Sequence, residues 1–416
     1  MGGPARYSHE EAARRHLEAA TRWQDKITTA ARDIGDSIPW DGVNWKRRKR
    51  CKKSLKTFCE TYLKRTCSLG WSKDQEIFLE LAQKSMSEGG KCAVGMPRGG
   101  GKSTLSRATV LYGICYGFTR YVTFVAATEK LAVRAMDFIK ANLYGNELLQ
   151  QDFPEICYAI KRLNNRGNLA RGQLCHGRLT EVVWSSDSIR MPIITMPEEV
   201  AKSYLKQDKK SVIKVKKSDG SLEYMSAQSW VIVNVAGITG NIRGSNETHP
   251  LTLEVIRPDF VILDDIQDDQ SAINPETVKY YIRLVDGTIE GLAGPDGAIS
   301  GLMPCTVIAV NDVADQYLSH EVKPEWHGVR CKMILQYPEG IDDYTISCAT
   351  ESGRLWLEYI DLRKKSHQVY CDNRLALEFY KEHRKEMDAG FEVTWPERYD
   401  RKTEVSAIQS AMEKKI

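Results

Sequence analysis

The chain has 416 residues, of which 42% are hydrophobic and 27% charged, and its formal net charge is +4. This length allows a sizeable hydrophobic core and predicts two or three structural units. No stretch reaches the roughly 18 apolar residues of a membrane span, and the amino terminus lacks the apolar stretch of a signal peptide. We therefore expect a soluble, intracellular protein without a membrane partner.

The eleven cysteines are widely and irregularly spaced, which predicts reduced thiols rather than a disulfide framework. Cys51, Cys59 and Cys67 recur at even intervals, but a zinc site favours ligand pairs two to four residues apart. Cys175 next to His176 is a weaker candidate still. We expect no metal centre built on cysteine.

Positive charge is concentrated in the run WKRRKRCKK at residues 45–53, continued by Lys56, Lys64 and Arg65. One interpretation is the solvated face of a helix. The other is a surface that contacts phosphates or an acidic partner.

Helix formers with apolar spacing occupy residues 8–35, and a basic helix is expected to follow through Leu63. After residue 70, short apolar runs alternate with stretches of helix-forming residues. The expected order is strand (91–96), helix (102–116), strand (121–128) and helix (129–143). This βαβα order predicts a parallel sheet covered by helices.

Residues 152–227 are polar and predict an insertion of extended structure, with a turn at 217–221. Strands are expected again at 230–235, 260–263 and 306–310. The last eighty or so residues are charged, with helices expected at about 372–390 and 402–415.

The sequence GMPRGGGKST at residues 95–104 follows an apolar strand and opens a helix, which is the context of a phosphate-binding loop. Its glycines let backbone N–H groups surround the phosphates, and the helix amino terminus adds positive potential. Lys102 can reach the β- and γ-phosphates of ATP, and Ser103 can hold Mg²⁺. The general pattern has glycine where this chain has Met96. The expected phosphate-binding residues are Pro97, Gly99, Gly100, Gly101, Lys102, Ser103 and Thr104.

A second motif, RPDFVILDDIQDDQ at residues 257–270, is a buried strand that ends in two carboxylates. Such a strand delivers acids to the edge of the sheet where the phosphates lie. We expect Asp264 to hold Mg²⁺ and Asp265 to orient or deprotonate the attacking water, although glutamate is more usual in the second position. Asp268 and Asp269 either substitute for this pair or, as we favour, belong to a solvated loop.

Together these elements predict an α/β fold of the P-loop NTPase (RecA/ASCE-like) type, a parallel sheet flanked by helices. The expected units are a helical basic arm (1–65), an ATPase core (66–330) with its insertion, and a helical lid or linker (331–416).

These motifs resemble the ATPase region of the large subunit of tailed-bacteriophage terminases, the motor that packages viral DNA into a preformed capsid. In the family's loop, Pro or Ser precedes Arg, two variable residues and Gly-Lys-Ser/Thr, so Met96 is no departure. The resemblance implies that Arg98 stabilises charge on the transferring phosphoryl group and that Gln75, in the segment WSKDQ, reads adenine.

Three further segments are similar to the family. The run GNIRG at residues 240–244, followed by Arg257-Pro-Asp259, implies that Arg243 senses nucleotide or DNA, with a plain salt bridge as the alternative. The segment TVIAVND at 306–312 resembles the family's coupling motif, in which a strand ends in a small polar residue that can contact both the γ-phosphate and the acidic pair. In this chain that residue is Thr306 or Asn311. We favour Asn311, because it stands at the carboxyl end of the expected strand. The sequence TWPERY at 394–399 resembles the junction that precedes a nuclease region in these proteins.

The resemblance implies a motor that translocates double-stranded DNA into a procapsid in the host cytoplasm. Its implied partners are a small terminase subunit, the portal protein and further copies of the chain in a ring of five. A nuclease region is expected only in a longer protein. Two other functions remain open: a helicase-like DNA translocase, and a nucleotide-binding assembly module without turnover.

Overall fold

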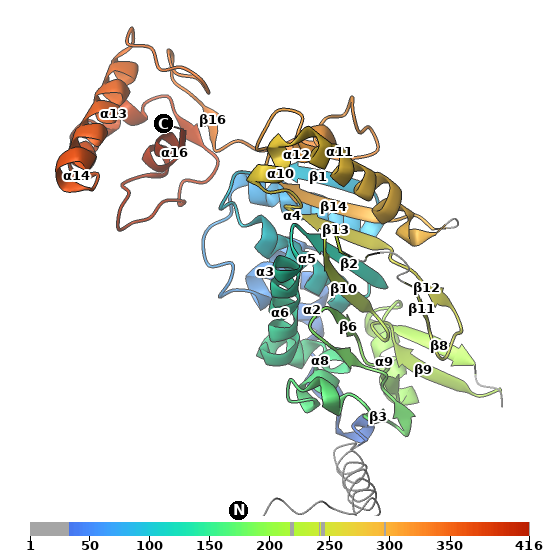
Figure 1. Ribbon diagram of the computed structural model, residues 1–416. Coiled ribbons are helices and arrows are strands. Elements are labelled where there is room, and N and C mark those ends of the chain that lie inside the picture. Colours follow the sequence, from blue (N-terminus) through green and yellow to red (C-terminus); the bar gives the residue numbers. More distant parts are fainter. Residues whose placement is uncertain (1–32, 217–219, 241, 243–245, 295–296, 416) are drawn as a thin grey trace, which may run out of the picture.

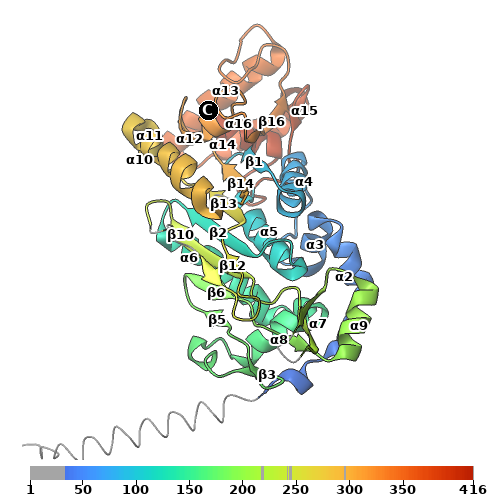
Figure 2. The same ribbon diagram turned by 90° about the vertical axis from the view of Figure 1, so that its right-hand side faces the viewer.

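The computed structural model describes residues 33–216, 220–240, 242, 246–294 and 297–415 (Figure 1). The helix expected at residues 8–35 lies almost entirely outside the described residues. Figures 1 and 2 show a central sheet with helices on both faces and a separate cluster of helices at the carboxyl-terminal end.

The central sheet has eight strands, and the first six strands in its order are parallel. The sheet ends in two antiparallel strands. In order across the sheet, the strands are β15 (His327–Arg330), β1 (Lys91–Gly95), β14 (Ser300–Cys305), β13 (Phe260–Asp264), β2 (Tyr121–Ala126), β10 (Ile232–Gly237), β6 (Ser188–Arg190) and β5 (Val183–Trp184). The prediction of a mainly parallel sheet flanked by helices is confirmed.

Side chains of the parallel strands point alternately to two apolar cores, as strand geometry requires. Val94 and Ile262 pack in the larger core, beneath α4 (Lys73–Glu88), α5 (Lys102–Tyr116) and α6 (Glu129–Gly145). Ala93 and Leu263 belong to the smaller core on the opposite face, with α11 (Pro275–Arg283) and α12 (Val313–Tyr317). Burial on both faces explains why these strands are continuous apolar runs.

The prediction of a strand at 306–310 is wrong. The strand is β14, which ends at Cys305, and residues 306–310 form a loop. The buried carboxylate of Asp312 accepts hydrogen bonds from the backbone N–H groups of Ile308 (2.7 Å) and Ala309 (2.9 Å). These bonds satisfy donors that a strand would use in its ladder.

The basic helix expected to run through Leu63 is divided into α2 (Trp45–Lys52) and α3 (Leu55–Tyr62). The break lies at Ser54, whose hydroxyl accepts from the N–H of Thr57 and caps α3. Three cations of α2 are neutralised within the chain. Arg47 pairs with Asp152 (2.6 Å), Arg48 with Glu155 (2.5 Å) and Lys52 with Asp208. These three cations therefore pair with acidic residues of the same chain and not with a separate acidic partner.

The insertion at 152–227 is not purely extended, because it contains α8 (Pro154–Arg162) and α9 (Glu198–Gln207). It also forms a three-stranded antiparallel sheet in the order β7-β9-β8. The turn expected at 217–221 falls in the sequence between β8 and β9, and its residues 217–219 lie outside the described part. The strands of the insertion outside the central sheet are β3 (Leu174–Cys175), β4 (Arg178–Leu179), β7 (Thr195–Met196), β8 (Val212–Lys216) and β9 (Leu222–Ser226).

We call residues 332–415 the C-terminal unit, which has its own core around Trp356, Tyr359 and Tyr380. The helix α13 was not expected, and the two expected helical regions contain shorter helices. The elements of the unit are β16 (Ile334–Gln336), α13 (Glu351–Tyr370), α14 (Arg374–Glu382), α15 (Arg384–Asp388), β17 (Glu392–Val393) and α16 (Ala407–Lys415). The remaining elements of the chain are η1 (Gly35–Ser37), η2 (Trp40–Gly42), α7 (Glu147–Asp152), η3 (Gly167–Leu169), β11 (Glu247–Thr248), β12 (Val255–Ile256), α10 (Asp269–Ile273), η4 (Leu284–Ile289) and η5 (Glu290–Ala293).

All eleven cysteines lie in the described part of the chain and are free thiols, as predicted. Within the described residues, no cluster of three or more His, Cys, Asp or Glu side chains could hold a metal ion. None of the helices described has the length and apolar character needed to cross a membrane.

Candidate nucleotide site

The loop between β1 and α5 lies at the carboxyl edge of the parallel sheet. Gly99 (φ 76°) and Gly101 (φ 85°) occupy the left-handed region, which a residue with a Cβ rarely adopts. The turn closes with a hydrogen bond from the N–H of Gly100 to the carbonyl of Pro97 (3.1 Å). A cavity of about 260 Å³ beside the loop is lined by Arg98, Gly99, Gly100, Gly101, Lys102, Ser103, Thr104 and Asp265. The structure therefore brings the expected loop residues and one expected acid around one space.

The ammonium group of Lys102 points into the curve of this loop, and only 5% of the residue is exposed. Its Nζ donates to the carbonyl of Met96 (3.0 Å) and to the hydroxyl of Thr306 (2.8 Å). It lies 3.5 Å from a carboxylate oxygen of Asp265. An anion in the cavity would therefore compete with two neutral oxygens and one carboxylate for the ammonium group.

Asp264, the last residue of β13, is buried next to Ser103. Burial, reinforced by the neighbouring charge of Asp265, raises the pKa of Asp264 to about 6, and a hydrogen bond with Ser103 opposes this rise. One of its carboxylate oxygens, Oδ1, is buried without a hydrogen-bond partner. A buried carboxylate oxygen of this kind, beside a hydroxyl, fits a divalent cation that completes its shell with phosphate and water oxygens.

Asp265 and Thr306 lie between the phosphate loop and the strand edge. Asp265 follows β13 directly with a positive φ of 43°, and its N–H donates to the carbonyl of Pro304 (3.0 Å). The hydroxyl of Thr306 donates to a carboxylate oxygen of Asp265 (3.2 Å). Thr306 thus connects the lysine to the more exposed acid.

The structure corrects the reason for preferring Asn311. Since β14 ends at Cys305, the polar residue at its carboxyl end is Thr306. Asn311 lies in the following turn (φ 63°), where its N–H donates to Asp315 (2.7 Å). The role of Asn311 in catalysis stays a prediction, whereas Thr306 contacts two candidate catalytic groups.

Two site residues that sequence reasoning missed organise the loop after β14. Asp312 caps α12 and accepts from the loop backbone, as described above, and from Gln267 Nε2 (2.8 Å). Gln267 also donates to the carbonyl of Thr306 (3.2 Å) and accepts from the N–H of Val313 (2.9 Å). Gln267 therefore ties the loop after β13 to the loop after β14. In the sequence, only the position of Gln267, two residues after the acid pair, could have indicated its role.

Arg98 extends from the loop toward α10 and forms an ion pair with Asp269. The hydrogen bond with Asp269 raises the pKa of Arg98. Asp268 caps α10 through the N–H of Ser271 (2.8 Å). The favoured expectation was a solvated loop for both acids. Instead, Asp268 caps α10, and Asp269 is the first residue of that helix and restrains Arg98.

Gln75 is buried at the start of α4, and both ends of its amide are engaged. Its oxygen accepts from the N–H of Ser72 (3.1 Å), and its nitrogen donates to the carbonyl of Gly100 (3.0 Å). In this arrangement Gln75 supports the phosphate loop. Its reading of adenine stays a prediction.

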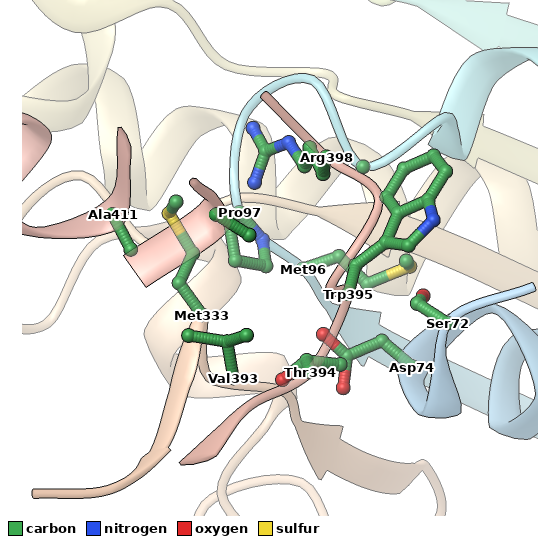
Figure 3. A pocket seen from close by; sticks show the side chains of 12 residues that line it. Ser72, Asp74, Met96, Pro97, Met333, Val393, Thr394, Trp395, Arg398 and Ala411 are labelled. Carbon is green, nitrogen blue, oxygen red and sulfur yellow. The ribbon is translucent and has the colours of Figure 1, made fainter. Parts of the chain in front are cut away.

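The C-terminal unit reaches the phosphate loop through Arg398, whose Nη2 donates to the carbonyl of Arg98. A Cβ on Gly99 would lie 2.9 Å from the same nitrogen. Burial lowers the pKa of Arg398. Figure 3 shows Arg398 and Trp395 beside Pro97 in a pocket of about 20 Å³, enough for about one water molecule. The segment TWPERY, noted in the sequence only for its resemblance, therefore lies against the glycine-rich loop at 95–104.

Further contacts hold the C-terminal unit to the start of α4. Glu397 accepts from the N–H of Gly70 (2.9 Å), and Lys73 pairs with Glu392 (2.6 Å). Arg243 and most of the segment at 240–244 lie outside the described residues.

The fold and site define a mixed α/β protein with a large, mostly parallel sheet and a glycine-rich loop at its carboxyl edge. A scan against models of known protein families finds no match. A search of curated proteins finds no significant relative.

Proposed function

We propose that this chain is an ATPase that translocates double-stranded DNA in viral DNA packaging, as the large subunit of a terminase does. The observation that carries the ATPase proposal is the convergence of Lys102, Thr306 and Asp265 beside the unpartnered buried oxygen of Asp264. A cation, a carboxylate and a candidate metal ligand meet at the edge of a parallel sheet where phosphates bind in related architectures.

In this proposal the loop backbone and the amino terminus of α5 bind the phosphates of ATP. Lys102 exchanges its contacts with the Met96 carbonyl for the β- and γ-phosphate oxygens. Ser103 and Asp264 would hold Mg²⁺, which supplies neutralisation of phosphate charge when it is bound. Gln75 keeps the loop in the geometry that receives the phosphates.

Hydrolysis then depends on positioning and electrostatics. Asp265 orients a water molecule and accepts its proton as the water oxygen attacks the γ-phosphorus and the bond to ADP breaks. Arg98 leaves Asp269 and supports the charge that develops on the phosphoryl group. Thr306 fixes the distance between Asp265 and Lys102 during this step.

The strand order supports a RecA/ASCE-like form of the proposal, because β14 lies between β1 and β13. This order places Thr306 where it contacts both neighbouring loops. Changes at the phosphates would reach α12 through Gln267 and Asp312. They would reach the C-terminal unit through Arg398.

The partners follow from the resemblance and belong to the same proposal. They are double-stranded DNA, a small terminase subunit, the portal protein and other copies of this chain in a ring of five. The motor would work in the host cytoplasm while docked on a procapsid.

The two alternatives make different demands on the structure. A helicase-like translocase needs a second RecA-like domain, whereas the described residues of the C-terminal unit form helices and one two-stranded sheet. A passive nucleotide-binding module needs neither Asp265 nor Arg98 at the phosphates.

The test is steady-state ATP hydrolysis with and without linear duplex DNA, for the wild-type chain and for Lys102→Ala and Arg98→Ala. We expect turnover in the wild type and none in Lys102→Ala. Arg98→Ala should lose rate while it still binds ATP. Tight ATP binding by the wild type without turnover under any condition would favour the passive module.

A further inference from the structure

Residues 156–180 contain five Lys or Arg residues and no Asp or Glu. Four of these cations, Lys161, Arg162, Arg166 and Arg171, lie between the end of α8 and the turn that precedes β3. We call residues 161–171 the basic loop. It is distinct from the basic run at 45–53.

The backbone of the basic loop is fixed against the edge of the central sheet. The carboxamide oxygen of Asn165 accepts from the indole N–H of Trp184 (2.9 Å). A Cβ on Gly167 would lie 2.6 Å from the carbonyl oxygen of Trp184, so the loop packs closely on β5. Leu163 is buried beneath it. The loop therefore presents its side chains from a defined scaffold.

The four cations of the basic loop are exposed, and none forms an ion pair with a carboxylate in the described part of the chain. In the described part of the chain, the ammonium group of Lys161 donates to the neutral carboxamide oxygen of Gln150 (2.8 Å). By contrast, the next cation, Arg178, is paired with Glu223 (2.8 Å). Three of the six cations of α2 are likewise paired, as described above. Positive potential therefore remains at the basic loop after internal pairing.

A groove of about 420 Å³ adjoins the loop and is lined by Pro39, Gln150, Tyr158, Lys161, Arg162 and Asn164. Its lining combines cations with neutral amides and one phenol, all of which can donate hydrogen bonds to phosphate oxygens. None of these residues lines the cavity beside the glycine-rich loop, and Figures 1 and 2 show α8 far from β1, the strand that leads into that loop. The groove is thus separate from the nucleotide site.

We propose that the basic loop and its groove form a contact surface for the phosphodiester backbone of double-stranded DNA. This proposal rests on the proposed function, because DNA is the polyanion on which such an ATPase acts. Unpaired arginine and lysine side chains on a fixed loop neutralise phosphates without reading base sequence. The binding surface is therefore expected to be tolerant of sequence and sensitive to salt.

The test measures binding of a fluorescent duplex of mixed sequence by anisotropy over a series of salt concentrations. The loop variant carries Lys161→Gln, Arg162→Gln, Arg166→Gln and Arg171→Gln. The control variant carries Lys46→Gln, Arg50→Gln, Lys53→Gln and Lys64→Gln, which remove the same charge from exposed positions near α2 and α3.

Each lost phosphate contact lowers the salt slope of log K by about 0.9. We expect the loop variant to lose roughly 2 to 4 in this slope and the control variant less than about 1. Equal losses in the two variants would show a general charge effect and overturn the proposal. Equally tight binding of polyglutamate and duplex, both abolished in the loop variant, would identify an acidic polypeptide as the partner and also overturn it.

ATP hydrolysis without DNA separates this proposal from the proposed function. The loop variant should keep the wild-type rate and its unfolding temperature, because its substitutions lie outside the nucleotide site. Unchanged duplex binding by a loop variant that still hydrolyses ATP would refute the proposed DNA contact surface but not the proposed ATPase function. Absence of ATP hydrolysis in the wild type would refute the proposed function, whatever the duplex-binding measurements show.

Discussion

Asp269→Asn should release Arg98 from its ion pair and modestly increase ATP hydrolysis. The side chains of Arg98 and Asp269 are 67% and 66% exposed, so solvent screens their attraction. Pairs this exposed contribute about 1 kcal/mol or less. If Arg98 must leave Asp269 before it supports the phosphoryl group, removing the pair lowers the barrier by at most that amount. The corresponding gain in rate is about fivefold or less.

The assay is steady-state phosphate release without DNA, at low and at moderate salt. Salt weakens the ion pair, so the wild-type rate should approach that of the variant as salt increases. Asp268→Asn is the matched control, because asparagine can still cap α10 and Asp268 does not pair with Arg98. A fall of a hundredfold or more in Asp269→Asn would refute this reasoning and make Asp269 part of the chemistry.

Three further predictions follow from buried or constrained residues. Gly99→Ala places a Cβ in the left-handed region, at a cost of about 1–2 kcal/mol, and should weaken ATP binding about tenfold, measured with a fluorescent nucleotide. Asp264→Asn should stabilise the nucleotide-free, metal-free chain at pH 7.5 by up to about 3 kcal/mol but change little at pH 4. The sign follows because the folded-state pKa of about 6 exceeds the ordinary 3.8, so the wild type loses stability as pH rises through that range, and denaturant unfolding at the two pH values checks it. Arg48→Ala leaves Glu155 buried without its partner and should cost about 3–5 kcal/mol in unfolding free energy, whereas exposed Lys46→Ala should stay within about 0.5 kcal/mol.

The first part of the core was predictable because local pattern and tertiary structure agree there. Apolar runs predicted the strands β1 and β2, and the glycine-rich loop marked the start of α5. The bounds of α5 match the prediction, whereas β1 and β2 end one and two residues earlier than expected. Both strands are buried in the core, and such burial leaves a continuous apolar run that can be recognised in a single sequence. The loop geometry followed from glycine at the positions with positive φ.

The strand β14 was missed because two local signals opposed its tertiary setting. Its sequence, SGLMPC, includes Gly301 and Pro304, which disfavour a central strand, yet it pairs with β1 over its length and with β13 over part of it. The neighbouring TVIAV reads as a strand, but its last residue, Val310, is 87% exposed. Asp312 determines this outcome through backbone contacts that no periodicity reveals.

Contacts between residues far apart in the chain were also beyond sequence reasoning. The ion pair of Arg47 with Asp152 and the bond from Arg398 to the phosphate loop join residues far apart in the chain. A basic run looks the same in sequence whether its partner is internal or external. Only the fold shows that the run at 45–53 is partly neutralised while the basic loop is not.

The most direct test of the central claim is single-turnover phosphate release from ATP by excess protein, for the wild type and for Asp265→Asn, with and without linear duplex DNA. The account predicts release by the wild type, and release at least about a hundredfold slower by the variant, as expected for loss of a base that orients water. Both proteins should bind ATP with similar affinity. Equal rates in the two proteins, or ATP bound by the wild type without any release, would contradict the account.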